Sequence, residues 1–509
     1  MDNSYCNVIL ERLDAAAEKF PDKAAFTEYG GKSLTFRQLR DKTCAIASAL
    51  RSALPENASD SPVAVMAHRT PGTVACMLGV IAAGGWYVPL DSELPPERLS
   101  LLLSVCRPAA VVTCSEEDSP ENEAVLSSLG VPVIHAASCA DVTGFKPADR
   151  DENEAMFGIF TSGSTGIPKL VVKSRRAMTS FIEVYCSTFD FTSDEVFGNQ
   201  IPFYFDASTK DIFATVWLGA STVIIPQKCF SFPVDLVKIL NEHKVTSITW
   251  VPSALSIAAR FNVFSASKPE YLRQVLFVGE LMPIKYINVW REALPGVRYV
   301  NLYGSTEVAG NSCYYILDRD FDPTGILPIG RPFANSEVFI LDPETLLPAD
   351  EGELCIAGDG LASSYYNDPE KTAGVFITKE FPDGIRRIYR SGDFGRINEY
   401  GEFVCVSRRD AQIKHMGHRI ELGEIEAAAA SLPYVAEACC FYSHAEEKII
   451  ICYSAASDEK KQLRADLAKL LPKYMIPHTF FWYEALPHNR NGKIDRAGLK
   501  AQVLDGGGK

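Results

Sequence analysis

Short apolar and β-branched runs alternate with stretches of helical periodicity along most of the chain. The runs lie at 63–67, 110–113, 222–226, 245–251 and 273–279, and polar segments separate them. Strands that are apolar on both faces, with helices between them, are typical of parallel sheets. The pattern therefore predicts an α/β fold whose large N-terminal domain consists of mainly parallel sheets flanked by helices.

The pattern changes near residue 400. A strand leads through the charged segment "SRRDAQIKHMGHR" into a helix that Glu421 and Glu424 open, and shorter strands and one further helix follow. This order is typical of a compact α+β unit. We therefore expect a large domain at 1–407, a hinge at 408–410, and a small mobile C-terminal domain at 411–509.

Composition narrows the class of protein. Of the 509 residues 47% are hydrophobic and 22% are charged, which is typical of a globular protein. No apolar run reaches the roughly 18 residues of a membrane span, and the acidic N-terminus is unlike a signal peptide. The net charge of −14 disfavours nonspecific nucleic-acid binding. We expect a cytoplasmic protein with neither membrane insertion nor a nucleic-acid partner.

The 14 cysteines contain no Cys-x-x-Cys spacing, and we expect them to be reduced, small apolar residues. His415 and His418 are three residues apart but lack nearby ligands in metal-binding spacing. The sequence therefore predicts neither a disulfide framework nor a zinc site.

One segment, "IFTSGSTGIPKLVVKS" at 159–174, concentrates hydroxyl side chains and glycines between apolar residues. Gly163 and Gly166 allow the backbone to approach a ligand closely, and backbone amides and hydroxyls then offer donors. Lys169 adds a positive charge that suits a polyphosphate. The spacing is not that of a Walker loop, but the segment favours anion binding.

Six further motifs follow this loop in order. They are "FYFDASTKDIF", "NLYGSTEVAG", "GELCIAGDGLASSYY", "YRSGDFGRI", "SRRDAQIKHMGHRIELGEIE" and "LPHNRNGKIDR". Together the series resembles that of the adenylate-forming enzymes, from about residue 10 to 500. The resemblance is strongest to the amino-acid adenylation domains of nonribosomal peptide synthetases and to D-alanine:D-alanyl carrier protein ligases.

The resemblance implies an adenylate-forming fold and a ligase activity in two half-reactions. An amino acid would be activated by ATP with Mg²⁺ as aminoacyl-AMP, and pyrophosphate would be released. The aminoacyl group would then pass to the phosphopantetheine thiol of a carrier protein. Because no carrier segment follows the last motif, we expect that partner to be a separate protein.

The resemblance also assigns an ATP site. Glu307 would hold Mg²⁺, Thr306 would approach the α-phosphate, and both count as catalytic. Tyr303 would stack on adenine, and Asp393 with Arg408 would bind the ribose. The phosphate-binding loop would comprise Thr161, Ser162, Gly163, Ser164, Thr165, Gly166 and Lys169.

Three positions in the last motifs have implied roles in catalysis or domain movement. Lys493 would bridge the substrate carboxylate and the α-phosphate as the principal catalytic residue. Asp410 would be the hinge about which the small domain rotates, and Gly417 would flank the pantetheine tunnel. One departure from the family pattern is Leu170, where a glycine usually follows the loop lysine; we expect it to modulate ATP binding rather than abolish it.

Asp206 matches the position that pairs with the substrate α-ammonium, which favours an amino acid as substrate. The implied side-chain pocket contains Ala207, Lys210, Ser253, Leu276, Val278, Leu302, Gly310 and Asn311. An inward Lys210 would select glutamate or aspartate. A Lys210 that extends to solvent would leave a small pocket for alanine, including D-alanine. Both alternatives remain open at this point.

Two other functions have to be weighed. An acyl- or aryl-CoA ligase shares the fold, and Asp206 argues against it because such acids have no ammonium group. An inactive nucleotide-binding scaffold is the alternative from a different class. The joint presence of Lys493, Glu307 and Asp393 argues against the scaffold.

Overall fold

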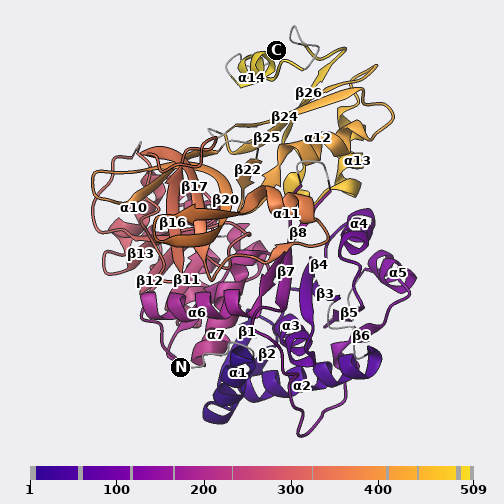
Figure 1. Ribbon diagram of the computed structural model, residues 1–509, viewed down its shortest axis with the longest axis vertical. Coiled ribbons are helices and arrows are strands. Elements are labelled where there is room, and N and C mark those ends of the chain that lie inside the picture. Colours follow the sequence, from indigo (N-terminus) through magenta and orange to yellow (C-terminus); the bar gives the residue numbers. More distant parts are fainter. Residues whose placement is uncertain are drawn as a thin grey trace.

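The computed structural model describes residues 7–55, 61–114, 119–163, 167–231, 233–323, 325–408, 412–443, 446–488 and 494–504. Three sheets and their helices form the body of the molecule, and the C-terminal segments form a smaller lobe at one end (Figure 1). The α/β class predicted from the sequence is confirmed.

The first sheet is parallel in its centre and antiparallel at its edges. Its order is β15 (Arg331–Pro332), β14 (Cys313–Ile316), β13 (Arg298–Tyr303), β12 (Gln274–Val278), β11 (Ser247–Trp250), β9 (Val196–Asn199), β10 (Ser221–Ile224), β1 (Ala24–Glu28) and β2 (Ser33–Thr35). The central strands are buried along their whole length, as their continuous apolar runs predict.

The second sheet is parallel from β7 to β6 and antiparallel at the edge formed by β8 and β18. Its order is β18 (Ser364–Tyr365), β8 (Lys169–Ser174), β7 (Ala155–Thr161), β4 (Trp86–Asp91), β3 (Pro62–Ala67), β5 (Ala110–Thr113) and β6 (Val133–His135). The β8 strand runs antiparallel to its neighbour β7, so the loop between Thr161 and Lys169 connects the two strands as a hairpin. That loop is the hydroxyl-rich segment of the sequence.

Helices cover the two parallel sheets, and several of them begin with proline, whose fixed φ suits the first helical position. The helix bounds are α1 Val8–Lys19, α2 Phe36–Ala53, α3 Pro71–Ala83, α4 Pro96–Cys106, α5 Pro120–Ser128, α6 Arg175–Thr188, α7 Thr209–Leu218, α8 Pro233–Glu242, α9 Pro252–Arg260, α10 Ile284–Ala293 and α11 Pro369–Val375. A capping box of Thr35 and Gln38 opens α2.

A third sheet is antiparallel throughout and differs from the mainly parallel pattern of the first two. It consists of β16 (Ser336–Leu341), β17 (Glu351–Gly358), β20 (Gly384–Ile397) and β19 (Phe376–Phe381), with β21 (Phe403–Arg408) paired to β20. Buried and less buried residues alternate along the second half of β20, because one face of this sheet packs inward.

The C-terminal lobe has a hydrophobic core of its own, formed by residues between Ile413 and Phe480. It contains β22 (Gln412–His415), β23 (His418–Glu421), α12 (Leu422–Ala430), β24 (Glu437–Ser443), β25 (Lys448–Ser454), α13 (Lys460–Leu470), β26 (Thr479–Tyr483) and α14 (Arg496–Leu504). Figure 1 shows this yellow lobe above α4 and α11. The separate core supports the proposed boundary at 408–410; the proposed hinge residue Asp410 lies outside the described residues.

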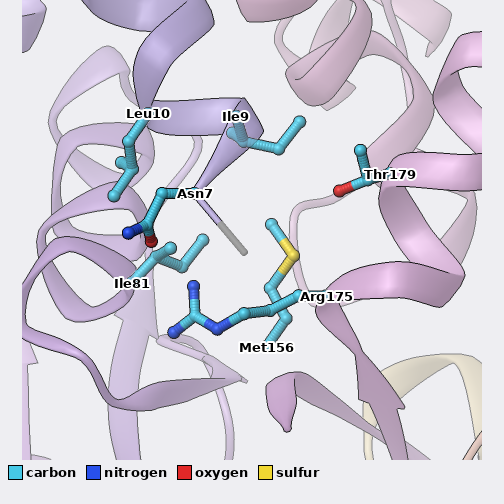
Figure 2. A pocket seen from close by; sticks show the side chains of 7 residues that line it. All are labelled: Asn7, Ile9, Leu10, Ile81, Met156, Arg175 and Thr179. Carbon is cyan, nitrogen blue, oxygen red and sulfur yellow. The ribbon is translucent and has the colours of Figure 1, made fainter. Parts of the chain in front are cut away.

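Two cavities differ greatly in size. The smaller, of about 10 Å³, lies between α1, α3, β7 and α6, and Figure 2 shows Arg175 and Met156 on one side of it. A space of that size holds at most a single water molecule. The larger, of about 460 Å³, lies where the body meets the C-terminal lobe. In the described part of the chain, no helix combines the length and apolarity that a membrane crossing requires.

Candidate active site

The larger cavity collects the ends of elements from both parts of the molecule. Its walls come from the end of β7, the 200–207 loop, the ends of β12 and β13, the β22–β23 hairpin and the 472–475 segment. The carboxyl ends of parallel strands are the usual place for a ligand site in such sheets. Most of the sequence motifs therefore meet at one location.

The start of the phosphate-binding loop lies on the cavity wall. Thr161 and Ser162 are buried and line the cavity, and the Thr161 hydroxyl oxygen has no hydrogen-bond partner among the described residues. A Cβ on Gly163 would lie 1.8 Å from the carbonyl oxygen of Ile167, so this position requires glycine. The predicted loop residues Ser164, Thr165 and Gly166 lie outside the described residues.

Lys169 begins β8 at the far end of this loop. Its ammonium lies 5.5 Å from the centre of the Tyr365 ring and does not itself line the cavity. Burial lowers the pKa of Lys169, and the nearby positive charge of Arg419 lowers it further. A buried, unpartnered hydroxyl, a backbone with no room for a side chain and an adjacent cation together fit a phosphate group.

Glu307 is fully buried just beyond the end of β13. The Tyr365 hydroxyl donates to Glu307 Oε1 at 2.8 Å, and Arg419 Nη1 donates to Oε2 at 2.6 Å. Burial alone raises the pKa of Glu307, but Arg419 and these hydrogen bonds outweigh it and hold the pKa at about 2. A permanently ionised carboxylate is the oxygen donor that a hard cation such as Mg²⁺ prefers, so this residue fits the implied metal.

Arg419, the cation that pairs with Glu307, lies on β23 of the C-terminal lobe. Ser162 Oγ donates to the carbonyl oxygen of Arg419 and accepts from the backbone N–H of Glu421, each at 3.0 Å. The β22–β23 hairpin is therefore hydrogen-bonded both to Ser162 of the phosphate-binding loop and to the buried carboxylate of Glu307. The sequence identified Ser162 and Glu307 but gave no indication of Arg419, because this pairing spans more than 100 residues.

The turn of the same hairpin is fixed by a second carboxylate. The backbone N–H of Gly417 donates to Glu280 Oε1 at 2.6 Å, and the N–H of Ser253 donates to Glu280 Oε2 at 3.1 Å. Gly417 has φ +82°, and a Cβ there would lie 2.5 Å from Cγ1 of Val251. Gly417 lines the cavity, its predicted place beside a pantetheine tunnel stays a prediction, and the sequence gave no indication of the role of Glu280.

A buried ion pair ties α4 to α12 next to this hairpin. Arg98 Nη2 lies 2.5 Å from Glu424 Oε1, and these side chains are 7% and 1% exposed. Nearby, the rings of His418 and Tyr474 stack with centres 3.5 Å apart, and burial lowers the pKa of His418. A neutral His418 therefore forms part of the cavity wall.

The predicted adenine and ribose residues contact each other. The Tyr303 hydroxyl donates to Asp393 Oδ2 at 2.7 Å, and both residues are buried. Arg408 stands opposite Asp393 in the register of β20 and β21. Neither Tyr303 nor Asp393 lines the cavity, whereas Thr306 does. Tyr303 and Asp393 are thus hydrogen-bonded to each other in this arrangement, and Arg408 lies opposite Asp393 in the strand register.

Most of the predicted side-chain pocket is brought together. The cavity is lined by Asp206, Ala207, Lys210, Ser253, Val278, Gly310 and Asn311. Leu276 and Leu302 are buried in the hydrophobic core and are not among the lining residues. A Cβ on Gly310 would lie 2.0 Å from the Phe181 ring, so glycine is required there.

Lys210 on α7 is completely buried, and its ammonium has no hydrogen-bond partner among the described residues. Burial lowers the pKa of Lys210 to about 8, against the opposing influence of Asp206 and Asp211. The side-chain amide of Asn311 is likewise buried without a partner in the described chain. The pocket therefore contains a cation and an amide with unfilled hydrogen-bonding capacity.

A second buried lysine was not anticipated. Lys173 lies on β8 with no exposed side-chain surface and donates to Asp206 Oδ1 in a short ion pair. Its ammonium also lies 3.4 Å from the carbonyl oxygen of Val308. The one available signal was a lysine within the apolar run "LVVKS". Lys493, the predicted principal catalytic residue, lies outside the described residues.

Residues 13–366 match the AMP-binding enzyme family, and residues 424–493 match the AMP-binding enzyme C-terminal domain. The chain is 31% identical over 503 residues to gramicidin S synthase 2 of Aneurinibacillus migulanus, covering 96% of this chain and 11% of that relative. It is 30% identical over 508 residues to surfactin synthase subunit 1 of Bacillus subtilis (strain 168), covering 97% and 14% respectively. The chain thus spans a small part of these relatives.

Solved structures of the same fold include holo-PA1221, a nonribosomal peptide synthetase protein containing adenylation and PCP domains. The TM-score is 0.82 at 24% identity, with 97% of this chain and 84% of that chain covered. The amide bond synthetase McbA from Marinactinospora thermotolerans gives a TM-score of 0.83 at 22% identity, with 97% and 99% covered. The family match over most of the chain, together with the shared fold, shows that this chain belongs to the AMP-binding enzymes.

Proposed function

We propose that this protein uses ATP to activate an amino acid with an acidic side chain, and then transfers the aminoacyl group to the phosphopantetheine thiol of a carrier protein. The observation that carries the substrate assignment is Lys210, whose ammonium is buried at the cavity and unpartnered among the described residues. A buried charge is costly until it is paired. A glutamate or aspartate side chain would supply the missing anion.

The alternative of a small substrate such as alanine requires Lys210 to extend to solvent. Lys210 is instead fully buried within the cavity wall, and Asn311 of the same wall has a side-chain amide without a partner among the described residues. Alanine would leave both groups without partners, at a cost of about 1–3 kcal/mol for each polar group and more for a charge. The pocket therefore favours a polar, negatively charged side chain.

In the first half-reaction a substrate carboxylate oxygen attacks the α-phosphorus of ATP, and the bond to pyrophosphate breaks. Thr161, Ser162 and Lys169 would bind the leaving phosphates. Glu307 would hold Mg²⁺, which neutralises phosphate charge when bound. We propose that Lys493 stabilises the reacting centre, as its motif implies.

In the second half-reaction the carrier thiol attacks the acyl carbon and AMP leaves. The docked hairpin supports an arrangement suited to this step, because Arg419 and Ser162 are then engaged with each other's elements rather than with ATP phosphates. Gly417 would border the path of the pantetheine arm. We propose that rotation about Asp410 exchanges this arrangement for one that presents Lys493.

The experiment is pyrophosphate release by the purified protein with ATP and Mg²⁺, across L- and D-amino acids, benzoate and a medium-chain fatty acid. Release with glutamate or aspartate, but not with alanine, is the expected result. Release with alanine alone would overturn the acidic assignment, and release with benzoate or the fatty acid alone would favour the acyl- or aryl-ligase alternative. Nucleotide binding without release on any acid would favour the inactive scaffold.

A further inference from the structure

The carboxylate at the expected ammonium-binding position already has a counter-ion within the protein. Lys173 reaches Asp206 from the interior of β8, and the Phe157 ring lies 5.5 Å from its ammonium. Lys173 has no exposed surface, and the body of the second sheet encloses it. An ammonium enclosed in this way cannot exchange Asp206 for water, so the pair is a permanent part of the site.

Asp206 still faces the cavity. Its side chain is 12% exposed, it lines the cavity, and its ion pair with Lys173 involves Oδ1. Burial raises the pKa of Asp206, whereas Lys173 and, more weakly, Lys210 lower it. The charges of two buried lysines therefore already act on Asp206, and they oppose the approach of a third ammonium group.

An unpaired carboxylate would make the substrate amine indispensable. Sites that must hydrogen-bond a substrate group reject analogues that lack it by about 10⁴-fold, because the protein group is then left buried and unpaired. Lys173 removes that penalty, since Asp206 remains paired when the substrate has no amine. The presence of Asp206 in the sequence is therefore weaker evidence for an amine requirement than its motif implies.

We infer that the α-amino group of the substrate is dispensable at this site, and that the enzyme also activates the corresponding acids without it. With an acidic side chain, these acids are unbranched dicarboxylic acids such as glutarate and succinate. The reaction balances without the amine: a carboxylate oxygen forms the bond to the α-phosphorus, and pyrophosphate leaves. This inference rests on the proposed adenylation activity.

The test is the ratio of kcat/KM for an amino acid to that for its deamino analogue, measured by pyrophosphate release. Glutamate is paired with glutarate, and alanine with propionate, so that the ratio does not depend on which side chain the enzyme prefers. We expect the wild-type ratio to be within about tenfold. In Lys173→Met the ratio should rise to about a thousandfold, because Asp206 then depends on the substrate amine.

A double variant, Lys173→Met with Asp206→Asn, removes both charges and guards against a single variant that fails to fold. Its ratio should return to within about tenfold. A wild-type ratio above a hundredfold would overturn the inference while leaving the proposed function intact. An equal loss for both acids in Lys173→Met would assign Lys173 a merely structural role. Absence of release with every acid would overturn both proposals.

Discussion

Glu307 is fully buried next to Thr306 of the cavity wall, Asp206 lines the cavity with a side chain that is 12% exposed, and each carboxylate is paired with a cation of the protein. The cation on Glu307 is Arg419, which belongs to the hairpin of the C-terminal lobe. The cation on Asp206 is Lys173, which belongs to a strand in the same body as Asp206 itself. In the proposed domain rotation the first partner would leave with the lobe, whereas the second would stay.

The protonation behaviour of the two carboxylates differs accordingly. Burial raises the pKa of Asp206, and its lysine only partly offsets that effect. Burial acts on Glu307 too, but the charge of Arg419 and two hydrogen bonds hold its pKa at about 2. We infer that the two pairs differ in function. Arg419, on the C-terminal lobe, suits a carboxylate that binds different partners in the two half-reactions, whereas Lys173, in the same body as Asp206, suits a carboxylate that contributes to substrate specificity.

Replacement of Glu307 should have the largest effect on the adenylation rate. Glu307→Gln removes the negative charge that would hold Mg²⁺ against the phosphates, and we expect pyrophosphate release to fall about a thousandfold. The assay is pyrophosphate release at saturating amino acid. Glu292→Gln, on the exposed face of α10, is the matched control and should retain the wild-type rate. A loss of less than tenfold would remove Glu307 from the reaction.

Replacement of Arg419 should separate the two half-reactions. Arg419→Gln removes one partner of a buried ion pair that exists only while the hairpin is docked, and such losses cost about 3 kcal/mol or more. We expect thioester formation to fall about a hundredfold, while pyrophosphate release stays within about threefold of wild type.

The readouts are single-turnover transfer of the aminoacyl group to a pantetheinylated carrier, and pyrophosphate release under the same conditions. Arg419→Lys retains the charge and should recover part of the transfer rate. Equal losses in both half-reactions would show that Arg419 does not distinguish the two arrangements.

A smaller effect is expected from pH on the KM for glutamate. Burial holds the pKa of Lys210 at about 8, so its ammonium loses its proton as pH rises through that value. Above pH 8 the KM for glutamate should therefore rise by about tenfold per pH unit, because the cation that binds the side chain is lost. The Lys210→Met variant assayed with glutamate lacks the titrating ammonium, keeps the same substrate α-amine and serves as the control. Identical slopes in the wild type and in Lys210→Met would exclude Lys210 from side-chain recognition.

The sequence predicted the fold class and many of the residues that line the cavity, because these residues lie at the ends of strands or in the segments that follow them. Thr161 and Val278 end β7 and β12, Asp206 and Thr306 follow β9 and β13, and parallel strands bring their carboxyl ends to one edge. Leu276 shows the limit of this reasoning. It precedes Val278 by two residues on β12 but lies in the core, because depth along a strand is set by neighbouring elements.

The pairings within the site could not be predicted in this way. Arg419 meets Glu307 only because the C-terminal lobe docks on the body, and Glu280 meets Gly417 for the same reason. Lys173 within an apolar strand is compatible with a side chain at either face of the sheet. Its partner is defined by how the 200–207 loop folds back over β8, which local patterns do not record.

The most direct test of the central claim, that buried Lys210 recognises an acidic substrate side chain, is kcat/KM for glutamate and for methionine in Lys210→Met. Lys285→Met, on the exposed face of α10, is the matched control. We predict that Lys210→Met lowers kcat/KM for glutamate by about a hundredfold or more and raises kcat/KM for methionine, while Lys285→Met changes neither. An unchanged preference for glutamate in Lys210→Met would contradict this claim.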